Sequence, residues 1–216
     1  MTHTLVVYQT RKERSRDMDA RYPIHVTYHK ARKGNANKME GMVSINADTY
    51  NNPFCKNMAL IKGSVCERCY AMKLSAYYGP KSTAPFQRNS RLLNDELEEW
   101  QIPRLNAAYC RFHSFGELES DLHYYNLVRI AKANPDTHFA LWTKRPDLVT
   151  RQLTPLNLVL VYSTLMVNGV GAIPKGFNKS FVVRDDGRDL NCEESCFACL
   201  KCYKRDGEAF IRERLR

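Results

Sequence analysis

The chain has 216 residues, enough for one sizeable hydrophobic core, and we expect a single domain. Its 33 lysines and arginines outweigh 23 aspartates and glutamates, which gives a net charge of +10 and makes nucleic acid a candidate partner. No run approaches the roughly 18 apolar residues of a membrane span, and the N-terminus lacks the features of a signal peptide. We therefore expect a cytoplasmic protein without membrane contact.

Short apolar runs alternate with amphipathic stretches, and neither an internal repeat nor a Pro/Gly/Ser-rich linker interrupts them. The apolar runs predict strands at residues 41–48, 106–114, 138–143, 157–163 and 180–185. Helices are predicted at 85–100 and 117–135, the second ending at the Asn134-Pro135 stop signal. Their apolar faces comprise Leu93, Leu97 and Trp100 in the first helix, and Leu118, Leu122, Tyr125 and Val128 in the second.

Continuously apolar strands separated by helices indicate an α/β protein with a parallel sheet covered on both faces. A complete eight-unit barrel needs about 200 residues or more, so we expect an incomplete or variant TIM-like (β/α) barrel. Within this single domain, residues 1–37 form an N-terminal extension, 38–190 the barrel-like core and 191–216 a cysteine-cluster tail.

Polar residues follow the predicted strands directly. In parallel α/β folds the functional residues lie at the carboxyl ends of the strands, so these side chains are expected to line a shared cleft. Each of them could instead begin a loop or cap a helix, and the pattern does not decide whether the protein is an enzyme. The catalytic candidates are His113, Ser114, Glu117 and Lys144; the other residues at these ends are Gly116, Thr143, Ser163, Thr164, Arg184, Asp185 and Asp186.

Four of the eight cysteines crowd into the tail, with the spacing C-x3-C-x2-C-x2-C. Zinc knuckles usually supply two separated pairs of ligands, whereas successive x2 intervals are typical of ferredoxin-like iron–sulfur sites. The motif contains no histidine that would favour a mixed zinc site, and disulfides are rare in the cytoplasm. The tail ligands are Cys192, Cys196, Cys199 and Cys202; Cys110, inside a predicted strand, is expected to be a core residue.

A second group, Cys55, Cys66 and Cys69, follows the first predicted strand. Three thiols would leave one iron of a cluster open, as in radical S-adenosylmethionine (radical-SAM) enzymes. The spacing here, x10 then x2, differs from the x3 then x2 of those enzymes. Gly116 and Glu117, however, stand where such enzymes keep a Gly-Gly-Glu element for the methionine part of the cofactor.

Several stretches together resemble the gene product 88 family of bacteriophage and prophage proteins. They are "KMEGMVSINAD", "NPFC", "CERCYAMK", "CRFHSFGEL", "AKANPDTHFALWTK" and "NCEESCFACLKCY", in this order between residues 38 and 203. The resemblance implies an iron–sulfur protein on a variant TIM-barrel fold, with a [4Fe-4S] cluster bound by cysteines. It implies no established reaction, and a phage-encoded protein would act in the host-cell cytoplasm.

The seven cysteines of the two groups can be divided in two ways: two separate clusters, or one shared [4Fe-4S] cluster, which we prefer. The first functional hypothesis is a phage iron–sulfur protein that acts in redox or electron transfer with a redox partner protein. The alternative is a radical-SAM-like enzyme that uses Cys55, Cys66 and Cys69 and binds S-adenosylmethionine near Gly116 and Glu117. A second alternative, a zinc-stapled nucleic-acid-binding protein, rests on the charge, but acids interrupt several basic runs, which favours a solvated surface.

Overall fold

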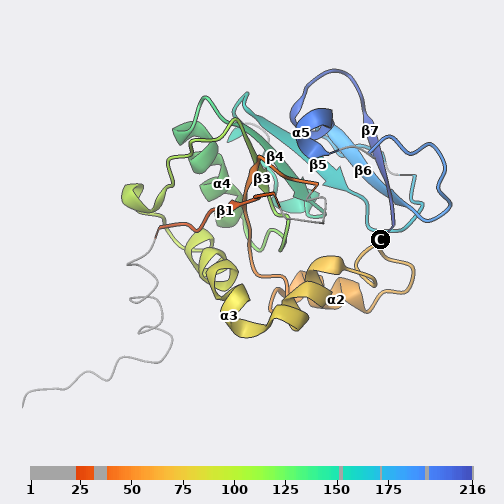
Figure 1. Cartoon of the computed structure of the whole chain (residues 1–216), viewed down its shortest axis with the longest axis horizontal. Coiled ribbons are helices and arrows are strands. Elements are labelled where there is room, and N and C mark those ends of the chain that lie inside the picture. The colour runs from red at the N-terminus through yellow and green to blue at the C-terminus, as the bar shows by residue number, and fades with distance from the viewer. Residues whose placement is uncertain (1–22, 32–37, 151–152, 171, 193–194, 216) are drawn as a thin grey trace, which may run out of the picture.

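The computed structural model describes residues 23–31, 38–150, 153–170, 172–192 and 195–215 (Figure 1). Most of the expected N-terminal extension, residues 1–37, lies outside these ranges. The strands are β1 (Thr27–Tyr28), β2 (Val43–Ile45), β3 (Tyr109–Phe112), β4 (His138–Thr143), β5 (Leu158–Ser163), β6 (Lys179–Arg184) and β7 (Phe210–Arg214). The helices are α2 (Pro53–Ala59), α3 (Tyr70–Leu93), α4 (Asp121–Ala133) and α5 (Cys196–Cys199), with short 3-10 turns η1 (Glu99–Gln101), η2 (Pro146–Leu148) and η4 (Lys201–Tyr203).

The protein has an α/β fold. Its strands form one mixed sheet in the order β1-β2-β3-β4-β5-β6-β7. β2 to β7 pair in parallel, as the sequence predicts, but β1 pairs with β2 antiparallel. The expected barrel is not confirmed, because the sheet is open in the part of the chain that the structure describes. A two-residue β1 offers few backbone groups for closing the sheet onto β7. The sheet also extends beyond residues 38–190 at both ends, through β1 and β7.

The two faces of the sheet bury different partners because side chains alternate along each strand. One face packs against α3 and α4, with Ile45, Cys110, Phe112 and Leu141 fully buried. The prediction that Cys110 is a core residue is therefore confirmed. The opposite face carries a second apolar group from β5, β6 and β7, against which the cysteine tail packs. Figure 1 shows α3 and α4 toward one side of the strands and α5 toward the other.

The predicted helix at 85–100 is the second half of a longer one. α3 begins at Tyr70, bends at Gly79, whose φ is 72°, and ends at Leu93. Gly79-Pro80 hid its first half from sequence reasoning, since both residues oppose helix formation. Trp100 is not on the buried face that we expected: it lies in η1 and its side chain is exposed.

α4 begins later than predicted because the side chain of Ser120 accepts a hydrogen bond from the backbone N–H of His123 and caps the helix. It ends at Ala133, directly before the predicted stop signal. Leu118 and Val128 are buried, but Leu122 and Tyr125 are exposed, so the predicted apolar face is only partly right. The helix uses Tyr124, Leu127, Val128, Ile130 and Ala131 to cover the sheet.

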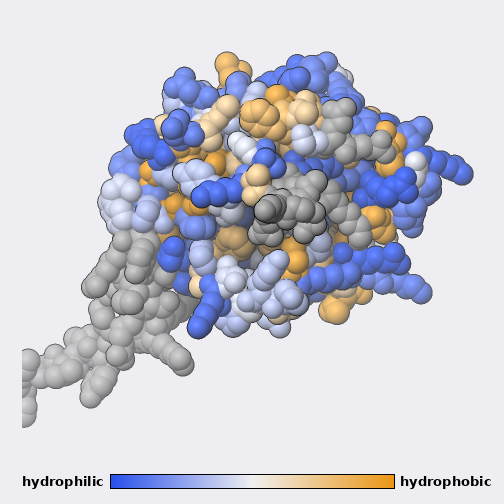
Figure 2. All heavy atoms as spheres, viewed as in Figure 1, coloured by the Kyte–Doolittle hydropathy of each residue, from blue (hydrophilic) through white to orange (hydrophobic). Residues whose placement is uncertain are grey.

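Hydrophilic side chains cover most of the face shown in Figure 2, and the apolar ones form small separate groups. No helix in the described ranges is both long and apolar enough to cross a membrane.

Candidate functional site

A cavity of about 890 Å³ lies at the carboxyl ends of the parallel strands and continues along the face of the sheet that the tail covers. All seven cysteines of the two groups line it. Only some of the polar residues that follow the strands also line the cavity: His113, Ser114, Gly116, Glu117, Lys144 and Ser163. Thr143, Thr164, Arg184, Asp185 and Asp186 are not among the lining residues. The structure thus brings together residues that lie up to 188 positions apart, from Thr27 to Leu215.

The first cysteine segment, residues 52–70, is fixed at both ends. Asn52 caps α2: its side-chain oxygen accepts a hydrogen bond from the backbone N–H of Cys55 at 3.1 Å, and its amide nitrogen donates to the carbonyl of Glu117 at 3.0 Å. Cys69 directly precedes α3, and the hydroxyl of Tyr70 donates to the carbonyl of Ser114 at 2.7 Å. This segment is therefore bound to the loop that follows β3.

The thiols of the first segment influence one another. Burial raises the pKa of Cys55, and the nearby charges of Glu117, Cys66 and Cys69 add to the effect. Burial also raises the pKa of Cys66, against the opposing charge of Lys144. Such thiols are protonated at neutral pH, so a metal that binds them must displace protons.

The tail segment, described at Cys192 and over residues 195–203, turns tightly around its thiols. Ser195 caps α5 through its side chain, and the backbone N–H of Cys196 donates to the carbonyl of Lys38 at 2.7 Å. Leu200 adopts a left-handed conformation with φ of 54°, which reverses the chain between Cys199 and Cys202. Burial raises the pKa of Cys202; Arg111 opposes this, whereas the other three tail thiols add to it.

Lys38 ties the tail to the sheet. Its Nζ donates to the carbonyl oxygen of Cys192 at 2.9 Å, to the Sγ of Cys192 at 3.3 Å and to Glu213 at 2.8 Å. Burial disfavours the charge of Lys38, but the hydrogen bond that Lys38 donates to Glu213 and the charges of Glu213 and Cys192 outweigh burial, so the pKa of Lys38 is raised. Sequence reasoning did not find Lys38, because it stands in an ordinary basic run with no motif around it.

Arg111 is a second cation that sequence reasoning missed. Its guanidinium lies over the ring of Trp142, 3.7 Å from the centroid, on the face of the sheet that the tail covers. Its charge opposes the burial-driven rise in the pKa of both Cys196 and Cys202. One signal could have revealed it: a charged residue stands in the middle of the apolar strand "YCRF".

The buried side chain of Glu117, in the loop after β3, forms hydrogen bonds with the carboxyl end of β4. Its carboxylate accepts hydrogen bonds from the backbone N–H groups of Leu118 and Lys144, both at 2.8 Å, and from the hydroxyl of Thr143. Burial raises its pKa, although Lys144 and these hydrogen bonds oppose the rise. The Nζ of Lys144 donates to the hydroxyl of Ser163 at 2.9 Å, which continues the rim to β5.

The loop after β3 fits closely against the loop after β2. Asn46 accepts hydrogen bonds from the backbone N–H groups of Ser114 and Phe115, and Thr49 accepts one from that of Gly116. Gly116 has a φ of 89°, and a Cβ there would lie 2.6 Å from the carbonyl oxygen of Ala47. Only glycine meets both requirements.

His113 forms the inner wall of the cavity. It has a φ of 63°, and its Nε2 lies 3.1 Å from the Nε2 of His123 in α4. Burial, followed by the charge of Arg111, lowers the pKa of His113 to about 3, and burial lowers that of His123 as well. Both rings are therefore neutral at physiological pH. The Nδ1 of His113 has no hydrogen-bond partner among the described residues.

The two cysteine groups do not form a ready-made site for a single metal ion. None of the eight cysteines, all of which are described, forms a disulfide. Among the described residues, no three His, Cys, Asp or Glu side chains come close enough together to hold one metal ion. The thiols instead surround a larger space.

The fold and this cavity define an α/β protein with a cysteine-lined pocket at the carboxyl edge of its sheet. The family model "Gene product 88" matches residues 23–201. The chain therefore belongs to the gene product 88 family, which confirms the resemblance noted in its sequence. No curated protein and no solved structure matches it.

Proposed function

We propose that this chain is an iron–sulfur protein that binds [4Fe-4S] clusters through its cysteines and acts in redox or electron transfer with a partner protein. The observation that supports this most is that all seven cysteines outside the sheet line one cavity. Thiolates are the ligands that iron–sulfur centres prefer. Membership of a family found in phages is consistent with action in the host-cell cytoplasm. We also propose that the open sheet, with its sequential strand order, is an incomplete TIM-like barrel.

A cluster suits the cavity better than zinc does. Around zinc, four thiolates at about 2.3 Å from the metal stand about 3.8 Å apart. The described thiols do not converge on such a point. An iron–sulfur cluster is wider and holds its cysteines further apart, which agrees with thiols spread around a cavity. The zinc-stapled alternative is therefore the weaker proposal.

The neighbours of each thiol favour two clusters over the single shared cluster expected from the sequence. The charges that most affect the pKa of Cys55 include Cys66 and Cys69 but no tail thiol. Those that act on Cys202 are Cys192, Cys196 and Cys199. We therefore propose a four-thiol site in the tail and a separate three-thiol site in the first segment.

The three-thiol site supports a second candidate, a radical-SAM-like enzyme. A cluster held by Cys55, Cys66 and Cys69 keeps one iron open, and S-adenosylmethionine bound there would supply a radical. The first segment is bound to the loop that contains Gly116 and Glu117, as this proposal requires. The carboxylate of Glu117, however, already accepts hydrogen bonds from Leu118, Thr143 and Lys144. We assign it to positioning the rim rather than to direct contact with the cofactor.

The test of the first proposal is anaerobic purification of the full chain, followed by measurement of iron, acid-labile sulfide and zinc per chain. Iron and sulfide in equal amounts are expected. Zinc without sulfide would contradict the proposal and favour the zinc-stapled alternative.

The second candidate is tested on the reduced, iron-loaded protein by adding S-adenosylmethionine. A change in the electron paramagnetic resonance signal of the cluster, together with cleavage of the cofactor, is expected of an enzyme. An unchanged signal with an intact cofactor would contradict the enzyme candidate and leave electron transfer as the remaining proposal.

A further inference from the structure

Three tyrosines stand at the mouth of the cavity with exposed rings. Tyr28 of β1 is 59% exposed, and Tyr70 at the start of α3 is 45% exposed. Tyr78, directly before the bend in α3, is 52% exposed. The hydroxyl of Tyr70 is held by Ser114, so its ring is fixed in place. Large exposed aromatic side chains gathered at one opening are typical of surfaces that bind a partner.

The cavity is also strongly basic. Among the described residues that line it there are seven lysines and arginines but only two acids, Glu117 and Glu213. Both acids are already engaged, Glu117 in backbone hydrogen bonds and Glu213 with Lys38. The cavity therefore has a clear excess of positive charge.

Part of this positive charge belongs to the proposed clusters. Lys38 contacts Cys192, Arg111 acts on Cys196 and Cys202, and Lys144 acts on Cys55 and Cys66. These three cations would offset the negative charge of thiolate-bound clusters, and this step rests on the proposed function.

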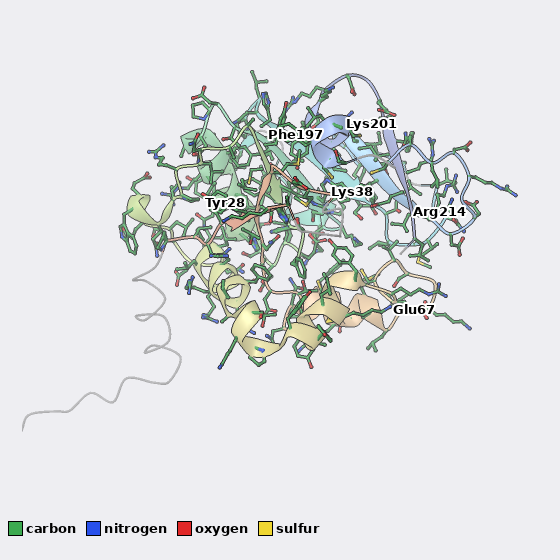
Figure 3. All side chains as sticks on the ribbon, in the orientation of Figure 1. Tyr28, Lys38, Glu67, Phe197, Lys201 and Arg214 are labelled. Carbon is green, nitrogen blue, oxygen red and sulfur yellow. The ribbon has the colours of Figure 1, made fainter. Side chains whose placement is uncertain are left out.

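Three further cations lie on the rim with exposed side chains: Lys30 after β1, Arg68 between α2 and α3, and Arg214 at the end of β7. A fourth, Lys201, forms an ion pair with Glu208 at 3.1 Å. Figure 3 shows Tyr28, Lys201 and Arg214 spread around the central position of Lys38. Segments far apart in the sequence thus supply one rim that carries both rings and positive charges.

We propose that this rim binds single-stranded nucleic acid and that one unpaired base enters the cavity. Aromatic rings that stack on bases, combined with cations that follow the phosphates, are the two features that single-strand-binding sites share. The net charge of +10 would favour the approach of such a strand. The cations come from three separate segments, which suits a ligand with several phosphates better than a mononucleotide. The cavity behind these rings, about 890 Å³, has room for one base.

The experiment uses the full, iron-loaded chain and fluorescent single strands of DNA and RNA about 12 nucleotides long, within the usual range of site sizes. A hairpin duplex and adenosine monophosphate serve as competitors. Binding is followed by fluorescence anisotropy between about 50 and 200 mM salt. The single strands are expected to bind, and neither competitor should displace them at matched concentration.

Two rim variants test the contacts. Tyr78→Ala should weaken binding about tenfold, because it removes a stacking surface. Arg68→Gln should lower the slope of log affinity against log salt by about 0.7, because it removes one phosphate contact. The matched controls are Tyr125→Ala and Lys132→Gln on α4, which are exposed residues that do not line the cavity. Both controls should bind as the wild type does.

Several outcomes would overturn the inference: no strand binding by iron-loaded protein, equal losses in rim and control variants, or displacement by the duplex or the mononucleotide. Iron and sulfide are measured in every variant and should equal those of the wild type. Normal iron content without strand binding overturns this inference alone. Absence of iron and sulfide overturns the proposed function, and the rim variants then still decide whether a strand binds.

Discussion

The two cysteine segments line the same cavity, yet they are held there by different physical means. The first segment is anchored by polar contacts, from Asn52 to Glu117 and from Tyr70 to Ser114. The tail instead covers an apolar face of the sheet, where Cys192 belongs to a buried group with Val161 and Phe181. The same type of residue therefore does not determine how a site is built: hydrogen bonds to the loop after β3 hold the first segment, whereas burial against the sheet acts together with the hydrogen bonds of Lys38 in the tail.

The largest expected effect is the loss of iron when one cysteine of either segment is replaced. Cys66→Ser and Cys199→Ser should each remove about half of the iron if each segment holds its own [4Fe-4S] cluster. A shared cluster would instead make either change remove nearly all of it. Iron and sulfide per chain, measured after anaerobic purification, distinguish the two arrangements, and Cys110→Ala is the control that should keep full iron content.

Gly116→Ala should disturb the anchoring of the first segment. The added Cβ would meet the carbonyl of Ala47 at 2.6 Å, and φ is 89°, so we expect a loss of about 2–4 kcal/mol in the free energy of unfolding. Gly207→Ala is the control: φ is 81° there but nothing lies within 4 Å, so only about 1 kcal/mol should be lost. Urea unfolding measures both values. Equal losses would show that the close contact with Ala47 is unimportant.

The buried histidine pair behind the first segment predicts a loss of stability in acid. The pKa of His113 is lowered to about 3 in the folded protein, whereas an unfolded histidine titrates near 6.5. The unfolded chain therefore binds more protons below about pH 6.5. The free energy of unfolding should fall by up to about 1.4 kcal/mol per pH unit for each ring.

Urea unfolding of the metal-free protein between about pH 7.5 and 5.5 tests this prediction. His123→Leu should reduce the slope, because it removes one of the two rings. His138→Gln, at an exposed position away from the pair, is the matched control variant. The raised pKa of buried Glu117 acts in the opposite direction, and the comparison of variants isolates the histidine part. Equal slopes in all three proteins would refute the prediction.

The smallest expected effect concerns the tail. Lys38→Met removes a hydrogen bond and a positive charge from Cys192, so a cluster there should be harder to reduce. The reduction potential, followed by electron paramagnetic resonance during a redox titration, should become more negative, and Lys38→Arg should restore it in part. An unchanged potential in Lys38→Met would mean that Lys38 only positions the backbone.

Much of the fold could be predicted from the sequence, because its central strands are nearly continuous apolar runs. All five predicted strands correspond to β2–β6. β1 and β7 were missed for a physical reason: β1 has two residues, and "FIRER" in β7 carries three charges. Neither resembles a buried strand, because edge strands are often very short or carry charged side chains.

The candidate site could be predicted as a set of residues but not as a geometry. The cysteines and the polar residues after β3 and β4 were visible because spacing and strand ends are local signals. Lys38, Arg111 and the rim of Lys30, Arg68 and Arg214 were not, because only the fold brings these scattered cations together. Part of the positive charge that is dispersed along the chain is thus gathered at one opening in space.

Cys110 provides an internal reference for experiments on the other thiols. It lies on the helix-covered face and is completely inaccessible, whereas Arg111 beside it points to the cavity face. In cluster-free native protein, an alkylating reagent should reach the six partly exposed cavity thiols, slowly where burial raises their pKa, and should spare Cys110 until the chain unfolds. Counting modified cysteines by mass spectrometry would then report, in one measurement, whether the cavity is filled and whether the sheet is intact.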